Sequence, residues 1–192
     1  MSPAADLTHQ RLIRAALELF SSRGYHDTTT AQIAKKAGVA EGTIYRHFPS
    51  KHQMLNDLYR GALRWAVKTV EDSGDPISSP PPRTRLAQVA QALVEGAGRD
   101  AAVVKLGLLE GHDAVLDDES RKTAREFRMA LERIIAQGKA EGAVRAGAVA
   151  VWAGVWLAVV GYALERVVSK EWKPGDAGVG LVIEAAWETI SA

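Results

Sequence analysis

The sequence predicts an all-α protein with a three-helix DNA-binding domain containing a helix-turn-helix at residues 1–55, followed by a larger helical domain at residues 56–192. Two observations support this fold class. Apolar residues recur at helical spacing along most of the chain, and a glycine turn joins two short amphipathic segments between Thr28 and Lys51. The 192 residues are 47% apolar, which is sufficient for a packed core.

The composition excludes several functional classes. The chain has no cysteine, so disulfides, thiol catalysis and cysteine-ligated metals are excluded. The formal net charge is +1, yet residues 1–55 carry a net +3, so the basic excess coincides with the helix-turn-helix, as phosphate binding favours. The first six residues lack the features of a signal peptide, and we expect a cytoplasmic protein without cofactor or metal.

The first predicted helix runs from Arg11 to Ser22, after a loose arm at residues 1–7. Gly24 is expected to end it, because a chain leaving a helix commonly needs a left-handed residue. The apolar residues at spacings of three and four are Leu12, Ala15, Ala16, Leu19 and Phe20.

The helix-turn-helix follows. Thr28 and Thr29 can cap a helix, and Gly38 supplies the turn after it. A second helix is predicted from Glu41 to Phe48, where Pro49 stops it. The residues expected to face inward are Ile33, Ala34, Ala37, Ile44 and Phe48.

The outward residues of the second helix suit DNA. Arg46 can reach a phosphate or a guanine edge, and Thr43 a base or a thymine methyl group. Tyr45 and His47 can bind phosphate oxygens, as can Lys51 beyond the helix end. Gly42 would allow close approach of the backbone. The alternative is purely structural, because Tyr45 and Phe48 would also serve a core.

From Arg11 to Leu55 the sequence resembles the tetracycline-repressor (TetR) family of bacterial transcriptional regulators, through RLIRAALELFSSRGY and TTTAQIAKKAGVAEGTIYRHFPSKHQML. The resemblance implies DNA contacts by Thr30, Ala40, Glu41, Gly42, Thr43, Tyr45, Arg46, His47 and Lys51. Two departures stand out: Ala40 lacks the hydroxyl that often caps the recognition helix, and Glu41 replaces a frequent basic residue. Glu41 would either read a base such as cytosine or serve as a tolerated cap.

Beyond the motif, Ser50 is predicted to cap a long helix that reaches about Asp72, and residues 73–83, with four prolines, to form a loop. Shorter helices are expected at 86–94, 101–109 and 120–138, with a break at 96–100. The acidic segment from Glu110 to Glu119 contains His112. We interpret it as a solvated connector in which Asp117 or Asp118 caps the next helix, with metal binding as the alternative.

Residues 146–164 form an uncharged run of 19, long enough for a membrane span. We instead predict a helix buried on all sides by its own protein, because the run is rich in alanine and glycine and Glu165 follows in the same helical phase. Its small residues, Ala150, Gly154, Ala158 and Gly161, share one stripe, and Trp152 and Trp156 project from nearly the opposite side.

The last predicted helix, ending near Ile190, is also apolar on one face. Two consecutive apolar helices exceed the needs of a small core, so one is expected to pack against a second subunit. The family resemblance implies a homodimer formed by the last two helices, which would place two recognition helices about one DNA turn, roughly 34 Å, apart on a palindromic operator.

The leading functional hypothesis is a ligand-responsive transcriptional repressor released from DNA by a small, largely apolar effector. The candidate effector-binding residues are Trp65, Glu110, His112, Phe127, Trp152 and Trp156. Alternatively, the protein binds DNA as a regulator or architectural protein without an effector, in which case the second domain should have a solid core. An enzyme is disfavoured, because no catalytic motif is apparent.

Overall fold

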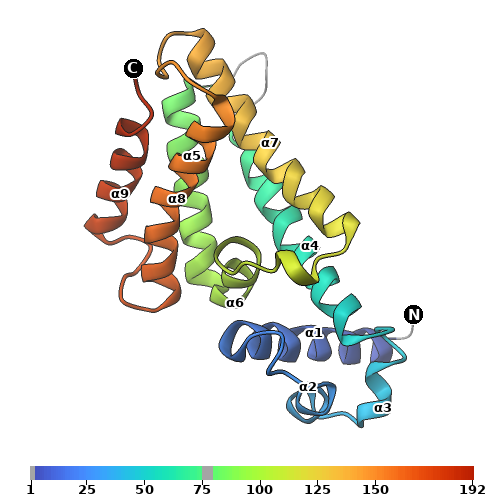
Figure 1. Ribbon diagram of the computed structural model, residues 1–192. Coiled ribbons are helices and arrows are strands. Elements are labelled where there is room, and N and C mark those ends of the chain that lie inside the picture. The colour runs from blue at the N-terminus through green and yellow to red at the C-terminus, as the bar shows by residue number, and fades with distance from the viewer. Residues whose placement is uncertain (1–2, 75–79) are drawn as a thin grey trace.

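The computed structural model describes residues 3–74 and 80–192, and its described elements are helical (Figure 1). In order they are α1 (Pro3–Arg23), α2 (Thr30–Ala37), α3 (Glu41–Ile44), α4 (Lys51–Glu71), α5 (Pro82–Arg99), α6 (Ala101–Val104), the π-helix η1 (Lys105–Leu109), the 3-10 helix η2 (Asp113–Val115), α7 (Asp118–Ala140), α8 (Val149–Val168) and α9 (Ala177–Glu188). The all-α prediction is confirmed.

Two groups of buried side chains correspond to two parts of the molecule. The helices α1, α2 and α3 lie together at one end, and α4 leads from them into a larger body that contains α5, α7, α8 and α9 (Figure 1). The predicted boundary at residues 55 and 56 falls inside α4. The core of the smaller part includes Leu106, which comes from η1 far along the chain.

Three helix boundaries differ from the sequence prediction. The helix α1 already begins at Pro3, so the described part of the predicted arm is helical; residues 1 and 2 lie outside the described residues. Proline is tolerated in a first helical turn, and Asp6 suits the positive end of the helix dipole. The helix α3 ends at Ile44, because the chain then turns tightly toward Pro49. Near residues 73–83 only part of the predicted loop is described, and Pro82 already belongs to α5.

The predicted break at residues 96–100 is wrong, because α5 continues to Arg99. Gly96 lies against the indole of Trp65, where an added Cβ would come within 2.3 Å of Trp65 Cζ2. Gly98 similarly faces Pro174. These glycines allow close packing and do not end the helix. Likewise α7 extends past Gly138, which packs against Val144, to Ala140.

The prediction that α8 is buried on all sides is also wrong. Trp156 is buried and Trp152 half-buried, but Ala150, Gly154 and Ala158 on the other face are exposed in the single chain. By length and composition α8 could cross a membrane, with 33% of its apolar window buried, but one such helix is weak evidence for a span. An exposed apolar face therefore remains to be covered.

Candidate DNA-binding surface and effector cavities

Local interactions define the helix-turn-helix. The hydroxyl of Thr29 accepts a hydrogen bond from the Gln32 backbone N–H, and the Gln32 side chain accepts one from the Thr29 N–H, which completes a capping box at the start of α2. Gly38 adopts φ 70° and ends this helix in the left-handed conformation that glycine favours. Buried Thr28 donates from its hydroxyl to the Gly24 carbonyl at 2.8 Å and so ties the motif to α1.

The start of α3 is stabilised without the usual hydroxyl cap. Ala40 makes no side-chain capping bond. Instead, the hydroxyl of Thr30 donates to Oε1 of Glu41 across 2.9 Å and joins the first turns of α2 and α3. The two departures from the family pattern are thus linked in the structure, since Glu41 replaces a basic residue and also has a partner on the preceding helix.

The exposed side of α3 and of the turn after it carries most of the predicted DNA contacts. Ile44 and Phe48 are buried in the core as expected. Tyr45 is 56% exposed, which contradicts a core role for it, and Arg46 is exposed beside it. Thr43 is half-buried. The surface therefore offers a guanidinium, a phenol and a hydroxyl to a ligand.

His47 is less free than its neighbours. The ring of His9, on α1, stacks on Phe48 with centroids 4.9 Å apart and lies 5.6 Å from the ring of His47. This contact explains why α1 extends further toward the N-terminus than its apolar pattern indicates. It also orients His47 at the edge of the exposed surface.

Lys51 has a structural role in addition to its predicted phosphate contact. Its ammonium donates to the backbone carbonyls of Tyr25 and Thr28, both at 2.8 Å, and lies 4.2 Å from the centroid of the Tyr25 ring. Burial lowers the pKa of Lys51, against an opposing effect of the Asp27 charge. An ammonium has three N–H donors, so one remains for a phosphate.

A chain of ion pairs connects the motif to the larger domain. Glu18 pairs with Lys36 of α2 at 2.8 Å and with Arg14 at 2.7 Å. Arg14 also reaches Asp100, which caps α6 by accepting a hydrogen bond from the Val103 N–H. A movement of α6 would thus be felt by α1 and α2.

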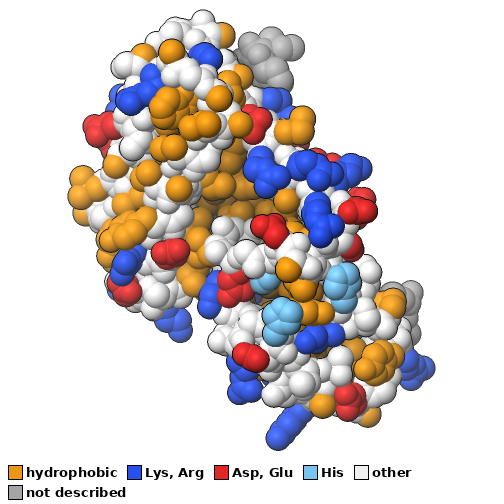
Figure 2. All heavy atoms as spheres, viewed as in Figure 1, with side chains coloured by type: hydrophobic (Ala, Val, Ile, Leu, Met, Phe, Trp, Pro, Cys, Tyr) orange, Lys and Arg blue, Asp and Glu red, His pale blue; other side chains and the backbone are white. Residues whose placement is uncertain are grey.

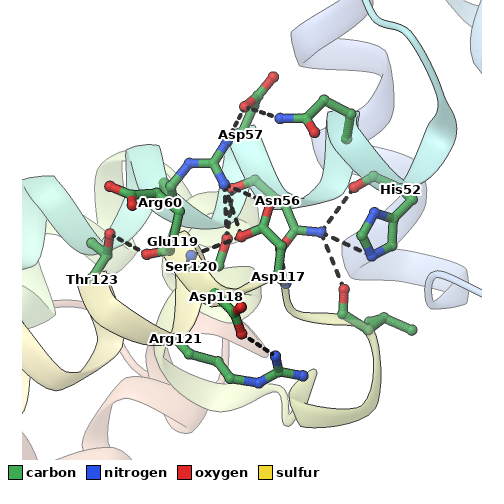
Figure 3. A network of polar contacts seen from close by, with 12 residues as sticks. His52, Asn56, Asp57, Arg60, Asp117, Asp118, Glu119, Ser120, Arg121 and Thr123 are labelled. Carbon is green, nitrogen blue, oxygen red and sulfur yellow. Dashed lines mark hydrogen bonds and ion pairs between the residues drawn. The ribbon is translucent and has the colours of Figure 1, made fainter.

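A second connection is a polar network between α4 and α7 (Figure 3). The guanidinium of Arg60, whose side chain is only 10% exposed, binds both carboxylate oxygens of Asp117 and contacts Asp57 and Ser120. Asn56 is fully buried; its amide donates to the Val115 carbonyl, and its oxygen accepts from the Asp117 N–H. This network fixes the start of α7 against α4. It also confirms the predicted capping role of Asp117, which accepts from the Ser120 N–H.

The six predicted effector-binding residues do not line one cavity. Trp65 lines a cavity of about 160 Å³ between α4, α5 and α6, together with Gly96, Arg99, Asp100, Val103 and Val104. Glu110 and His112 line a different cavity, at the junction with the DNA-binding domain. Phe127 and Trp156 are buried in the main core. Trp152 lies near Arg145, and its indole N–H donates to the Ala146 carbonyl.

The predicted alternatives for the acidic segment can also be located. Asp118 pairs with Arg121, and Glu110 lies 3.4 Å from Lys105. Within residues 3–74 and 80–192, no group of three or more histidines and carboxylates could hold a metal ion. Sequence reasoning missed His9, Asn56, Arg60 and Asp100, because each acts through a partner distant in the chain.

Comparisons with known proteins agree with this geometry. Residues 12–58 match the model for bacterial regulatory proteins of the tetR family. The chain is 33% identical to the nucleoid occlusion factor SlmA of Marinobacter nauticus over 141 residues, covering 72% of this chain and 69% of that protein. It is 28% identical to the fatty acid metabolism regulator protein of Bacillus subtilis over 142 residues, 72% of each chain.

Other similarities are shorter or concern the fold alone. The HTH-type transcriptional repressor KstR2 of Mycobacterium tuberculosis is 38% identical over 69 residues, which is 36% of this chain and only 34% of the repressor's length. A TetR-family regulator from Marinobacter aquaeolei has a solved structure that superposes with a TM-score of 0.80 at 18% identity, covering 100% of this chain and 99% of that one.

A braced helix-turn-helix with an exposed recognition surface, joined to a larger helical body, defines a DNA-binding regulator. The chain belongs to the tetR family of bacterial regulatory proteins.

Proposed function

We propose that this protein is a cytoplasmic transcriptional repressor that binds a palindromic operator as a homodimer and dissociates when a small, largely apolar effector binds. The observation that carries the proposal is the exposure of Tyr45 and Arg46 on a helix-turn-helix whose other face is fully packed. Such a rigid surface can enter a major groove without rearrangement.

Electrostatics support DNA as the partner. Arg46 is exposed and Lys51 keeps a free N–H, whereas the acid among the predicted contacts, Glu41, accepts a hydrogen bond from Thr30. Nuclease protection of DNA by the purified protein would identify the operator. Affinity should fall steeply with salt concentration and depend on sequence. Sequence-blind binding would contradict the proposal.

The exposed face of α8 and part of α9 support the dimer. On α8 the small residues Ala150, Gly154 and Ala158 allow close approach of another helix, and Val151 and Tyr162 are exposed beside them. On α9 Leu181 is 73% exposed. A second copy of this face would cover these residues in a two-fold dimer. We expect sedimentation at twice the chain mass, and Leu181→Glu should shift the equilibrium toward monomer.

The cavity beneath Trp65 supports an effector. It borders Asp100, which is the residue that α1 contacts through Arg14, so an occupant could disturb that link. Its volume of about 160 Å³ is below the roughly 300 Å³ of small-molecule sites, so binding requires the indole of Trp65 to move. Relatives include a fatty acid metabolism regulator, which supports an apolar, chain-like effector such as a fatty acyl compound.

Fluorescence tests the effector proposal. Fatty acids and their thioesters would be titrated into wild type and Trp65→Phe, with operator release measured in parallel. A compound that releases the operator should change the tryptophan emission of wild type much more than that of the variant. Equal changes in both proteins would move the effector site elsewhere, and release by no compound would favour a regulator without an effector.

A further inference from the structure

The junction between the two domains contains a second cavity, separate from the one at Trp65. Its volume is about 330 Å³, at the lower end of the roughly 300–1,000 Å³ typical of small-molecule sites. One wall is the α1–α2 turn, with Gly24, Tyr25 and His26, and the other is the segment Glu110–Val115. Histidine side chains gather at this junction in Figure 2. An occupant would touch both domains.

Two buried acceptors face each other in the wall of this cavity. Nε2 of His112 and Oε2 of Glu110 are 3.4 Å apart. Both atoms are buried and neither has a hydrogen-bond partner in the protein, although the side chain of His112 is only 7% exposed. Unsatisfied buried polar atoms are rare in proteins and call for a partner.

The surroundings of His112 define which partner is missing. Its ring hydrogen-bonds to the backbone of Leu106, in the π-helix η1, which a neutral ring can do only as a donor. Burial lowers the pKa of His112, against the opposing effects of Glu110, that hydrogen bond and Asp113, and so favours the neutral ring. With Nδ1 donating to Leu106, Nε2 presents a lone pair. The missing partner must therefore be a donor.

The charge of Glu110 narrows the choice further. Lys105 lies 3.4 Å from Oε1, the other carboxylate oxygen, and donates to the carbonyl of Ser21, so it does not serve Oε2. A charged donor gives a stronger hydrogen bond to a carboxylate than a neutral one. Two acceptors 3.4 Å apart can both lie within hydrogen-bond distance of one nitrogen atom.

We propose that the junction cavity binds a small primary amine, whose ammonium group donates to Oε2 of Glu110 and Nε2 of His112. An ammonium group has three donors, so two can be used here and one remains for water. Ala114, Val115 and the ring of Tyr25 also line the cavity and can accommodate a short alkyl chain. This site is independent of the apolar effector proposed for the Trp65 cavity.

Calorimetry on the full chain without DNA tests the inference, with n-butylamine hydrochloride as the probe. Butylamine should bind saturably at millimolar concentration, and n-butanol, which has the same alkyl chain without the charge, should not. Glu110→Gln should weaken binding by about tenfold or more, because it removes a charge-assisted hydrogen bond. The matched control is Asp113→Asn, an exposed neighbour with the same change of charge, which should bind butylamine like wild type.

Several outcomes would overturn the inference. Among them are equal binding of butanol and butylamine, no saturable binding, and undiminished binding to Glu110→Gln. Zinc that binds tightly to wild type but not to His112→Asn, with no amine binding, would indicate a metal site instead. Melting curves establish that each variant is folded. Operator binding is measured separately, so a protein that binds amine but not DNA contradicts the proposed function alone, and the converse contradicts this inference alone.

Discussion

Arg14 of α1 donates from Nη1 to Oδ2 of Asp100, at 2.7 Å, although 86 residues separate them in the chain. The same carboxylate caps α6 through Oδ1, which accepts from the Val103 N–H at 3.3 Å. One side chain thus stabilises the start of a helix in the larger domain and holds the first helix of the DNA-binding domain.

Two substitutions at Asp100 separate these roles. Asp100→Asn should cost less than about 1 kcal/mol of unfolding free energy, because asparagine still caps and the ion pair is partly exposed. Asp100→Ala should cost about 1 kcal/mol more, since the cap is also lost. Urea denaturation measures both. Equal costs would mean that the ion pair, and not the cap, provides the stability.

Arg46→Ala should weaken operator binding about tenfold or more while leaving the melting temperature unchanged, because Arg46 is exposed and contributes nothing to the core. Fluorescence anisotropy with operator DNA would measure the affinity at several salt concentrations. Loss of about one unit of salt slope would indicate a phosphate contact, and relaxed sequence preference a base contact. Arg133→Ala, an exposed arginine on α7, is the control and should bind normally.

Arg60→Met should destabilise the protein by about 3 kcal/mol, because it leaves Asp117 and Asp57 without their shared cation in a largely buried network. Arg64→Met changes the same residue type on the exposed side of α4 and should cost at most about 0.5 kcal/mol. Chemical denaturation compares the two. Similar costs would show that the network is dispensable.

Asp117 makes stability depend on pH. Burial alone would raise the pKa of its carboxyl group, but hydrogen bonds from Ser120 and Arg60 outweigh it and hold the pKa below the ordinary 3.8. A carboxyl group with a lower pKa in the folded state stabilises the protein above its unfolded pKa, and this contribution is lost as the pH falls through the folded pKa. Wild type should therefore lose stability on acidification below about pH 4.

The variant Asp117→Asn should show a smaller loss over the same acid range, because asparagine does not titrate. Unfolding free energies at a series of pH values would measure it. The exposed Asp118 provides the control, since Asp118→Asn should retain the wild-type pH dependence. Identical acid profiles for all three proteins would rule out this role for Asp117.

Gly96→Ala should displace the indole of Trp65, since the new Cβ would come within 2.3 Å of Cζ2. The expected cost is about 1–3 kcal/mol, with a shift in tryptophan emission. Gly61→Ala, in α4 with no atom within 4 Å of its Cβ position, should instead stabilise by about 0.5–1 kcal/mol. Unchanged emission in Gly96→Ala would show that Trp65 is not held against α5.

The helix-turn-helix could be predicted accurately because its signals are local. Thr29, Gly38 and Ser50 act on backbone groups within a few residues, so their roles can be recognised from neighbouring sequence. Gly96 was misinterpreted for the opposite reason: the residue that explains it, Trp65, lies on another helix. Periodicity also indicates which face a residue occupies but not what covers that face, which is why α8 was expected to be buried all round.

The effector-binding residues were the least predictable part. Trp65 and the pair Glu110 and His112 line separate cavities, and Trp156 belongs to the core. Aromatic and charged residue types identify candidates, but convergence on a cavity depends on how helices cross. No signal in the sequence indicated that Asn56 and Arg60 would meet Asp117, about 60 positions later.

Leu106 is fully buried, and it is enclosed by side chains of the DNA-binding domain although η1 belongs to the larger domain. A fragment ending near residue 55 would leave a hole where this leucine belongs and would expose the apolar residues around it. The isolated head should therefore be a poor substitute for the whole protein in DNA-binding assays. Evolution of new regulators by exchanging heads between relatives would require the incoming head to accept this leucine.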